Sequence, residues 1–310
     1  MKEFSVTVLG SSAAIATHDR NLTSHLVNHC QRLFLIDCGE GTQFRLRELK
    51  VRSNRIRHIF ISHLHGDHFF GLIGLISTMH LLRRTEELTI YGPPMLKEII
   101  ELQLEASQTQ VFYPLTFKTT QAVYEEEIYE DGKLAVTSFP LTHRIATTGF
   151  IFREKEMPRH INKQACDRYG VKIVQYESLR TGLDFIADDG EIIPNSELTT
   201  PPDYPRSYAY CSDTAYKEDI VPAIAGCDLL YHESTFAGDL TEAAAEKQHS
   251  TNVQAATIAK LAGAKKLMLG HFSARYEDLE PLLTEAKEVF PETILAEEGR
   301  TVYIGSPSMD

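Results

Sequence analysis

The sequence lacks any apolar run that approaches the roughly 20 residues of a membrane-spanning helix. Its first ten residues carry an early Glu3 and then alternate like a β-strand, so they do not resemble a signal peptide. The five cysteines form no CxxC pair, and their odd number favours reduced thiols over a disulfide framework. We therefore expect a cytoplasmic protein.

Basic charge is also scarce in this chain. There are 31 Lys and Arg against 43 Asp and Glu, and the net charge of −12 argues weakly against a nucleic-acid partner. Residues 153–180 are the exception, because they hold seven Lys or Arg and four Asp or Glu and leave −15 on the rest. Composition leaves two interpretations of this segment open, a phosphate-binding arm or a solvated helix face.

The hydrophobic patterns predict a mixed fold. The 310 residues suffice for one large α/β domain or two small ones, and the 43% hydrophobic content excludes a disordered chain. Strands are predicted at 4–10, 33–36, 58–61, 134–142, 207–212, 229–231 and 265–270. Helices are predicted at 43–50, 95–106, 241–247, 252–262 and 279–288, and a core helix starts within 69–76. This order predicts an α/β fold with two sheets packed face to face and helices outside.

Residues 153–206 break this pattern. They contain recurrent Pro and Gly and little periodicity, although they lie between two predicted strands. A stretch of about 50 residues of this kind indicates a functional excursion from the core.

A cluster of potential metal ligands follows the predicted strand at 58–61. Residues 63–68 read His-Leu-His-Gly-Asp-His, which places three histidines and a carboxylate on a loop leaving a strand. Neutral imidazole and carboxylate groups suit a borderline divalent cation such as zinc. Four such groups are too many for one open catalytic site, so the cluster predicts two metals. The alternative is a polar turn with scattered histidines.

Three further residues, His143, Asp213 and His271, each follow a predicted strand and can complete the two sites. Two neighbouring metals need about seven or eight ligand positions and a bridging carboxylate. A solvent molecule between such cations is hydroxide-like near neutral pH and can attack an ester or phosphodiester without a covalent intermediate. Asp67 can also orient this solvent and accept its proton. The predicted metal ligands are His63, His65, Asp67, His68, His143, Asp213 and His271.

A proton donor for the leaving group is predicted from two short segments, 232–235 and 249–251. If Glu233 bonds one nitrogen of His249, the other nitrogen can act as general acid. The alternative is structural, since Ser250 and Thr251 precede a predicted helix and suit its N-cap. A helix N-terminus also binds phosphate, so the two interpretations are compatible.

These motifs resemble the ribonuclease Z family, the tRNA 3′-processing endonucleases of the metallo-β-lactamase superfamily. The cluster at 63–68 alone identifies only the superfamily. The loop at 17–21 and the segments 232–236, 249–251 and 269–276 point to ribonuclease Z. The matching segments are 8–14, 17–21, 37–43, 63–72, 140–143, 212–214, 232–236, 249–251 and 269–276.

The resemblance implies a metallo-β-lactamase four-layer αβ/βα sandwich with a protruding arm. Residues 1–310 would form a single domain, with residues 153–206 as an inserted substrate-binding arm that lacks the usual Gly-Pro-rich tip. The implied cofactors are two Zn²⁺ ions per chain, with Mn²⁺ as a possible substitute. One zinc would take His63, His65 and His143, the other Asp67, His68 and His271, with Asp213 as the bridge.

The implied function is that of a zinc-dependent endoribonuclease that removes the 3′ trailer from precursor tRNA by metal-activated hydroxide attack on a phosphodiester. The resemblance also implies a homodimer, Asp67 as general base, and Glu233 and His249 as an acid relay. Ser250 and Thr251 are expected to bind substrate. Arg20 and Asn21 are expected to contact RNA near the cut, and the alternative for this loop is a stabilising hydrogen bond.

Two other functions remain as alternatives at this point. The first is a small-molecule phosphodiesterase or another hydrolase of the same fold, such as a lactonase or thioesterase. The second is a binding module with an inactive site. Cleavage of precursor tRNA compared with a small phosphodiester and a lactone separates the first from the lead interpretation, and metal content tests the second.

Overall fold

Two seven-stranded β-sheets lie at the centre of the computed structural model, which describes residues 3–17 and 19–305. His18, part of the 17–21 loop, lies outside the described residues. The chain divides into two units. The larger one, here called the body, comprises Lys2–Glu130, Ala135–Phe152 and Arg206–Asp310; the other, here called the small unit, comprises Asp131–Leu134 and Arg153–Pro205.

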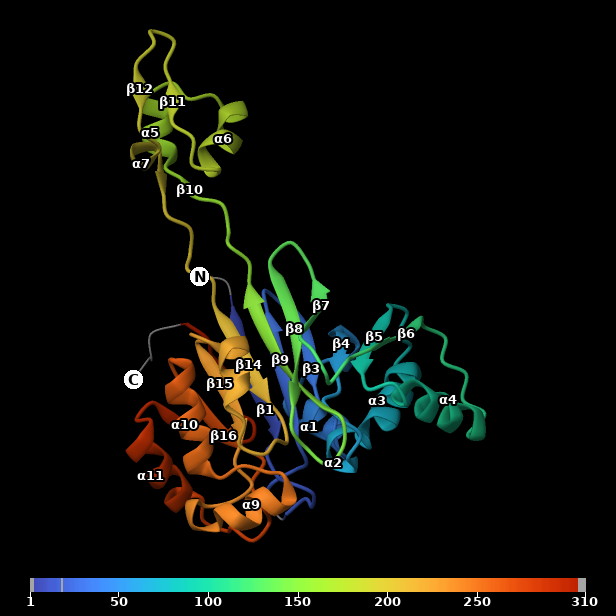
Figure 1. The fold of residues 1–310 in the computed structure, drawn as a ribbon. Coiled ribbons are helices and arrows are strands. Elements are labelled where there is room, and N and C mark those ends of the chain that lie inside the picture. Colours follow the sequence, from blue (N-terminus) through green and yellow to red (C-terminus); the bar gives the residue numbers. More distant parts are fainter. Residues whose placement is uncertain (1–2, 18, 306–310) are drawn as a thin grey trace. The chain divides into compact units, whose positions relative to one another are not determined.

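The first sheet has the strand order β18-β1-β2-β3-β4-β5-β6 (Figure 1). Its strands are β1 (Phe4–Gly10), β2 (Ser24–His29), β3 (Arg32–Ile36), β4 (Ile56–Phe60), β5 (Leu88–Gly92), β6 (Leu115–Thr119) and β18 (Thr301–Tyr303). Strands β1 to β3 are antiparallel, whereas β3 to β6 are parallel and need crossover connections. The crossovers contain α1 (Thr42–Glu48), η1 (Ser53–Arg55), α2 (Gly66–Phe69), α3 (Gly71–Leu81) and α4 (Leu96–Ala106).

The second sheet has the strand order β17-β16-β15-β14-β9-β8-β7. Its strands are β7 (Glu126–Glu130), β8 (Leu134–Leu141), β9 (Thr147–Glu154), β14 (Ser207–Cys211), β15 (Leu229–Glu233), β16 (Leu267–Gly270) and β17 (Thr293–Leu295). Strands β14 to β17 are parallel. Their connections contain η3 (Glu218–Ile220), α8 (Val221–Ile224), η4 (Gly238–Leu240), α9 (Thr241–Lys247), α10 (Asn252–Ala262) and α11 (Glu280–Val289).

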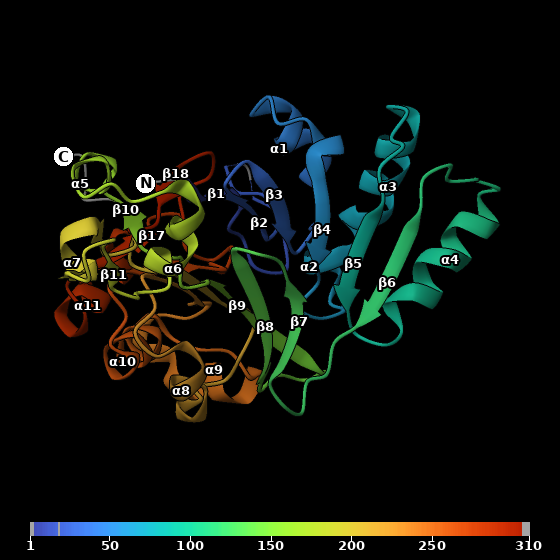
Figure 2. The same ribbon diagram turned by 90° about the horizontal axis from the view of Figure 1, so that it is seen from above.

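Buried aromatic side chains join the two sheets. The ring centroid of Phe60 on β4 lies 5.5 Å from that of Phe150 and 5.4 Å from that of Phe152, both on β9. Phe34 on β3 lies 5.8 Å from Phe152. Helices α3 and α4 lie beside β5 and β6 (Figure 2), and α10 and α11 lie beyond β15 and β16 (Figure 1). The structure confirms the predicted sandwich of two sheets with helices outside.

Most of the helices predicted in the body agree closely with the structure, and α10 has local capping signals at both ends. Helix α10 begins after Thr251, whose hydroxyl accepts a hydrogen bond from the Gln254 amide at 3.2 Å, and it ends at Gly263 in the left-handed conformation. Helix α9 spans the predicted 241–247. Among the helices of the described residues, none combines the length and apolar composition that a membrane span needs.

The small unit has its own apolar core. It is built from Ala165, Cys166, Val171, Leu179, Phe185, Ile193 and Leu198. Its elements have two to six residues each, which is too short for a periodic pattern to reveal them in the sequence. They are β10 (His160–Ile161), α5 (Lys163–Arg168), η2 (Ile173–Gln175), α6 (Tyr176–Arg180), β11 (Phe185–Ile186), β12 (Ile192–Ile193), α7 (Asn195–Leu198) and β13 (Thr199–Thr200). That this unit binds substrate stays a prediction.

Candidate active site

The candidate active site lies at the edge of the body where parallel strands end. In the register of the second sheet, Glu233 of β15 lies opposite Gly270 of β16, so the segments that follow β14, β15 and β16 leave the sheet side by side. These segments carry Asp213 and His271, and the segment after β4 carries residues 63–68. The sequence placed this whole cluster on a loop, but Asp67 and His68 lie in α2, which begins at Gly66. Ligands that are distant in the sequence therefore converge at one edge.

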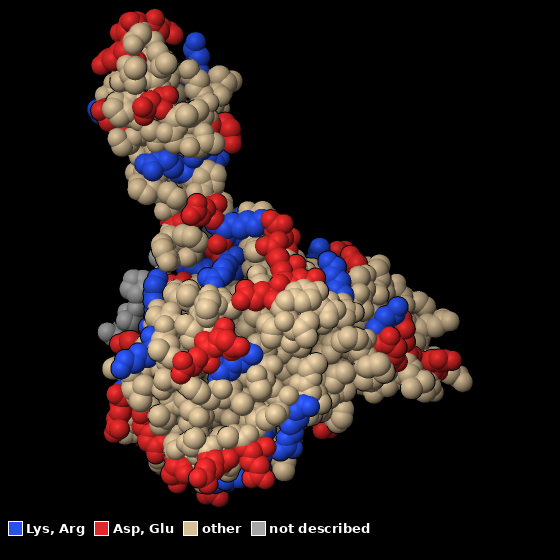
Figure 3. Space-filling model, viewed as in Figure 1, with Lys and Arg blue, Asp and Glu red and all other residues tan. Residues whose placement is uncertain are grey.

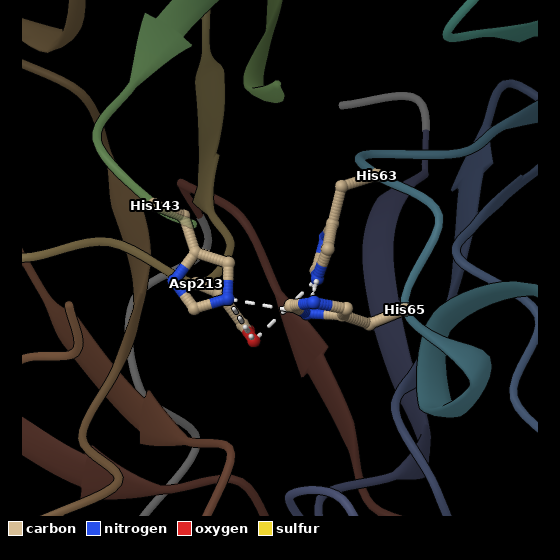
Figure 4. A group of neighbouring side chains, drawn as sticks. All are labelled: His63, His65, His143 and Asp213. Atoms are coloured by element: carbon tan, nitrogen blue, oxygen red, sulfur yellow. Dashed lines mark hydrogen bonds and ion pairs between the residues drawn. The ribbon is translucent and has the colours of Figure 1, made fainter. Parts of the chain in front are cut away.

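The first group of converging atoms comprises three imidazole nitrogens and one carboxylate oxygen (Figure 4). His65 Nδ1 lies 3.1 Å from His63 Nε2 and 3.2 Å from His143 Nε2. Asp213 Oδ2 lies 3.6 Å from His63 Nε2 and 3.7 Å from His143 Nε2. All four groups point at one small space.

The second group surrounds Oδ1, the other oxygen of the Asp213 carboxylate. Asp213 Oδ1 lies 3.1 Å from His271 Nε2 and 3.3 Å from His68 Nε2. Asp67 Oδ2 lies 3.3 Å from His271 Nε2 and 3.5 Å from His68 Nε2. The structure thus brings together all seven residues predicted as ligands and places Asp213 between two groups.

Four histidines are oriented by a partner on Nδ1, the ring nitrogen that faces away from these groups. The partners are Ser62 Oγ for His63 (3.0 Å), Asp37 Oδ2 for His68 (2.8 Å), the Gln248 carbonyl for His143 (2.7 Å) and Thr235 Oγ1 for His271 (2.8 Å). The hydroxyls of Ser62 and Thr235 donate their single hydrogen to Asp37 and Glu233, so they accept from the imidazole. Each Nδ1–H is therefore engaged, and Nε2 is the nitrogen that remains to bind a metal, as in metal-ligating histidines.

The electrostatics of the two groups favour a bound cation. Although burial raises it, the pKa of the Asp213 carboxyl is held well below its usual range by His271, His68 and His63. The pKa of Asp67 is also lowered, because His68 and His271 outweigh its burial. Burial lowers the pKa of His68, but Asp213, Asp67 and Asp37 outweigh it and raise this pKa well above its usual value. The buried carboxylates thus hold positive charge at this position.

The donor set fits metal ions. Asp213 Oδ1 is buried and accepts no hydrogen bond from the described residues, which is costly unless a cation satisfies it. Imidazole nitrogens and carboxylate oxygens are the ligand types that a borderline divalent ion accepts. The two groups therefore form a metal-binding site.

The buried Glu233 and the partly exposed His249 form a pair beside the metal-binding site. His249 Nδ1 lies 2.9 Å from Glu233 Oε1, which also accepts hydrogen bonds from the amides of Thr214 and Ser250. Thr235 donates its amide and hydroxyl to Glu233 Oε2 at 2.9 and 2.8 Å. Burial lowers the pKa of His249, but the Glu233 carboxylate outweighs it and raises this pKa to about 9. His249 is thus protonated at neutral pH.

Ser250 and Thr251 are buried and engaged within the protein. The Ser250 hydroxyl donates to the Thr214 carbonyl at 2.7 Å, and the Thr251 hydroxyl caps α10. Neither residue lines the cleft over the metal-binding site. This geometry favours the structural alternative for the two side chains, and their contact with substrate stays a prediction.

Arg20 and Asn21 are also engaged within the protein. The Arg20 guanidinium is buried and donates to the Tyr276 carbonyl at 2.7 Å. Asn21 donates its amide to Glu298 Oε1 and its side-chain amide to Glu298 Oε2, both at 2.6 Å. The structure favours the stabilising hydrogen bonds given as the alternative for this loop, and direct contact with RNA stays a prediction.

The sequence analysis assigned no role to three supporting residues. Asp37 follows β3 and orients His68, and its position after a strand is the same signal that singled out Asp213. Gln248 acts through its carbonyl, and Ala14 donates its backbone amide to Asp67 Oδ2 at 2.8 Å. Backbone groups leave no mark in residue type, so only the structure could reveal them.

A cleft of about 730 Å³ opens over the metal-binding site. Its lining includes three basic residues, Arg144, Lys247 and Arg275, in an otherwise acidic protein. Lys247 Nζ and the Arg275 guanidinium lie 5.8 and 5.1 Å from the ring centroid of the buried Phe236. Cations at this position suit an anionic substrate such as a phosphodiester.

Comparison with known proteins identifies the family. A family model described as "Anti-Pycsar protein Apyc1" matches residues 4–164, a range that ends before Asp213 and His271. The chain is 46% identical to "Ribonuclease Z" of Bacteroides fragilis over 98% of this chain and all of the relative. It is 45% identical to "Ribonuclease Z" of Bacteroides thetaiotaomicron over 99% of this chain and 97% of the relative.

A solved structure agrees with these relatives. The crystal structure of human tRNase Z, short form, superposes with a TM-score of 0.71 at 27% identity and covers 97% of this chain and all of the human chain. The similarity therefore extends over nearly the whole chain. The chain belongs to the ribonuclease Z family.

Proposed function

We propose that this chain is an endoribonuclease that hydrolyses the phosphodiester joining a tRNA to its 3′ trailer. The observation that carries the proposal is the complete set of converging ligands with the Glu233–His249 pair beside it, in a chain similar to ribonuclease Z over nearly its whole length. A small-molecule hydrolase of the same fold has no evident need for the small unit.

We assign the two converging groups to two zinc ions, with manganese as a substitute. His63, His65 and His143 would hold the first ion, and Asp67, His68 and His271 the second. Asp213 presents one carboxylate oxygen to each group and is the natural bridge. When bound, such ions supply Lewis-acid polarisation of the phosphate and acidify a water molecule.

Asp67 and His249 are placed to move protons on opposite sides of the reaction. Asp67 is ionised and is held by the Ala14 amide, so it can accept the proton of the attacking water. His249 is protonated and anchored through Nδ1, so its Nε2–H can protonate the leaving oxygen. Glu233 does not touch the substrate in this scheme, and it fixes the orientation and charge of His249.

We further propose that the small unit contributes to tRNA binding in a homodimer. Apart from Lys133, the basic residues of this unit lie within 153–180, whereas residues 181–205 contain six acidic and no basic residues. Figure 3 shows acidic side chains gathered at the β11–β12 end of this unit. We therefore assign the contact with phosphates to residues 153–180, the last of which ends α6, and not to the β11–β12 hairpin. Light scattering of the pure protein tests the dimer.

Incubation with a 3′-extended tRNA precursor, with the new ends mapped, tests the proposed function. Cleavage between the tRNA body and its trailer is the expected result. A small phosphodiester and a lactone, assayed in parallel, are expected to turn over far less efficiently. Efficient lactone hydrolysis without cleavage of the precursor would overturn the proposal. Since precursor tRNA is the substrate, we place the enzyme in the cytoplasm.

A further inference from the structure

Two large apolar side chains are exposed beside the metal-binding site. Phe70 is 61% exposed and Ile15 is 67% exposed, and both line the cleft. They flank the same ligand: Ile15 follows Ala14, which donates its amide to Asp67, and Phe70 lies one turn after Gly66, which precedes Asp67. Leaving a large apolar side chain in water forgoes its burial, so an exposed pair in a cleft calls for an explanation.

Glycines hold the Phe70 ring in this place. A Cβ atom on Gly66 would lie 2.3 Å from the Phe70 ring, so the ring lies directly over the Gly66 backbone. A Cβ atom on Gly71 would lie 2.1 Å from the Gly39 carbonyl oxygen, so the backbone after Phe70 is seated closely on that loop. The ring of Phe69 contacts one edge, with centroids 5.0 Å apart. The aromatic side chain is thus fixed in position while much of its surface stays open.

We propose that Phe70, with Ile15 beside it, forms a platform on which a nucleobase next to the scissile phosphate stacks. This inference rests on the proposed function. Bases of unpaired RNA stack on exposed aromatic rings, because every base has a π face, and apolar side chains add contact area. Phe236, the other phenylalanine among the described residues that line the cleft, is buried beneath Lys247 and Arg275 and offers no free face.

The charge of the same cleft favours RNA over a second protein chain as the occupant. Each nucleotide within an RNA strand is flanked by phosphates. Arg144, Lys247 and Arg275 line this cleft in a protein of net charge −12, together with Glu40 and the two ligand carboxylates. Stable protein interfaces bury at least about 1,000 Å² in total, which two side chains do not approach. An RNA strand with its phosphate at the metal-binding site and its base on Phe70 uses both features.

The test pairs enzyme variants with altered substrates. Wild type, Phe70→Ala, Phe70→Leu and Phe70→Trp are assayed on a precursor tRNA and on two versions that are abasic immediately before or after the cut. Phe70→Ala and Phe70→Leu are expected to lower kcat/KM by roughly 5- to 150-fold on the normal substrate, whereas Phe70→Trp retains activity. On one abasic substrate the wild type and Phe70→Ala should become equal. Phe44→Ala is the control, because Phe44 is 62% exposed but does not line the cleft.

Each outcome decides the question. Equal losses from Phe70→Ala on the normal and both abasic substrates would overturn the platform, as would full activity of Phe70→Ala. A smaller molecular mass for Phe70→Ala in light scattering would assign the surface to a subunit contact and also overturn it. If wild type leaves every precursor uncut, the proposed function fails. If Phe70→Ala does not fold, the same comparisons are made with Phe70→Leu.

Discussion

His249 Nδ1 lies 2.9 Å from Glu233 Oε1, and the carboxylate that holds this imidazole is fully buried and saturated with hydrogen bonds. A buried carboxylate with a single imidazole partner fixes both the direction and the charge of the ring. The pair therefore resembles the acid half of an acid–base mechanism whose other half is Asp67.

Replacing His249 with Ala is expected to slow tRNA cleavage by about 10²- to 10⁴-fold, since a general acid contributes this much. The metal content should stay the same, because His249 is not one of the proposed ligands. The loss should shrink on bis(p-nitrophenyl) phosphate, whose nitrophenolate leaving group needs little protonation. Equal losses on both substrates would reassign His249 to phosphate positioning.

The rate of cleavage is expected to fall on the alkaline side as His249 loses its proton. Its pKa is raised to about 9, so the protonated form is present below that value and is lost as the pH rises through it. Bound cations oppose protonation of His249, so the alkaline limb of the pH–rate profile should lie at or below pH 9. In Glu233→Gln the neutral amide no longer outweighs burial, and the limb should move to lower pH. Profiles of kcat against pH for both enzymes provide the measurement; an unmoved limb refutes the assignment.

Asp213→Ala should remove the bridge between the two metal groups. Both carboxylate oxygens are lost, so the metal content is expected to fall from two ions per chain to one or fewer, with loss of cleavage. Elemental analysis of the pure variant measures this. Asp219→Ala, at an exposed acidic residue paired with Lys217, is the control and should keep both ions. Two ions retained in Asp213→Ala would count against the bridge.

Arg20→Ala is expected to destabilise the protein more than it alters where tRNA is cut. The change removes the hydrogen bond of the buried, charged guanidinium to the Tyr276 carbonyl, which costs about 1.5–3 kcal/mol in the free energy of unfolding. Activity on tRNA and on the small phosphodiester should fall together, because this loop adjoins the segment after His271. Denaturant unfolding and both assays measure the effect, with the exposed Arg300→Ala as control. A shifted cleavage site at unchanged stability would restore direct RNA contact.

The small unit can be removed to test its role in binding. Replacing residues 157–204 with a short Gly/Ser linker leaves β9 and the buried Arg206 intact. The variant is expected to bind precursor tRNA much more weakly but to hydrolyse the small phosphodiester normally. Salt should inhibit the intact enzyme on tRNA more steeply than the shortened one, since phosphate contacts release counterions. Undiminished tRNA affinity in the shortened enzyme would refute the role.

The sequence by itself determined the elements of the body and the chemistry of its ligands. Thr251 and Gly263 mark the ends of α10 through local capping. The spacing of the histidines and the carboxylate in 63–68 indicates metal binding without any tertiary information. Signals of this kind act over a few residues, and that is why they could be read directly.

Only the tertiary structure decided how these parts meet. The parallel register of β14, β15 and β16 brings Asp213 between two groups of histidines, and a register is a property of paired strands that no single segment encodes. Arg20 is a second example of a role that only the tertiary structure decides. By residue type alone, its guanidinium suits RNA and a carbonyl equally well. The packing of distant segments buries Arg20 and commits its guanidinium to the Tyr276 carbonyl.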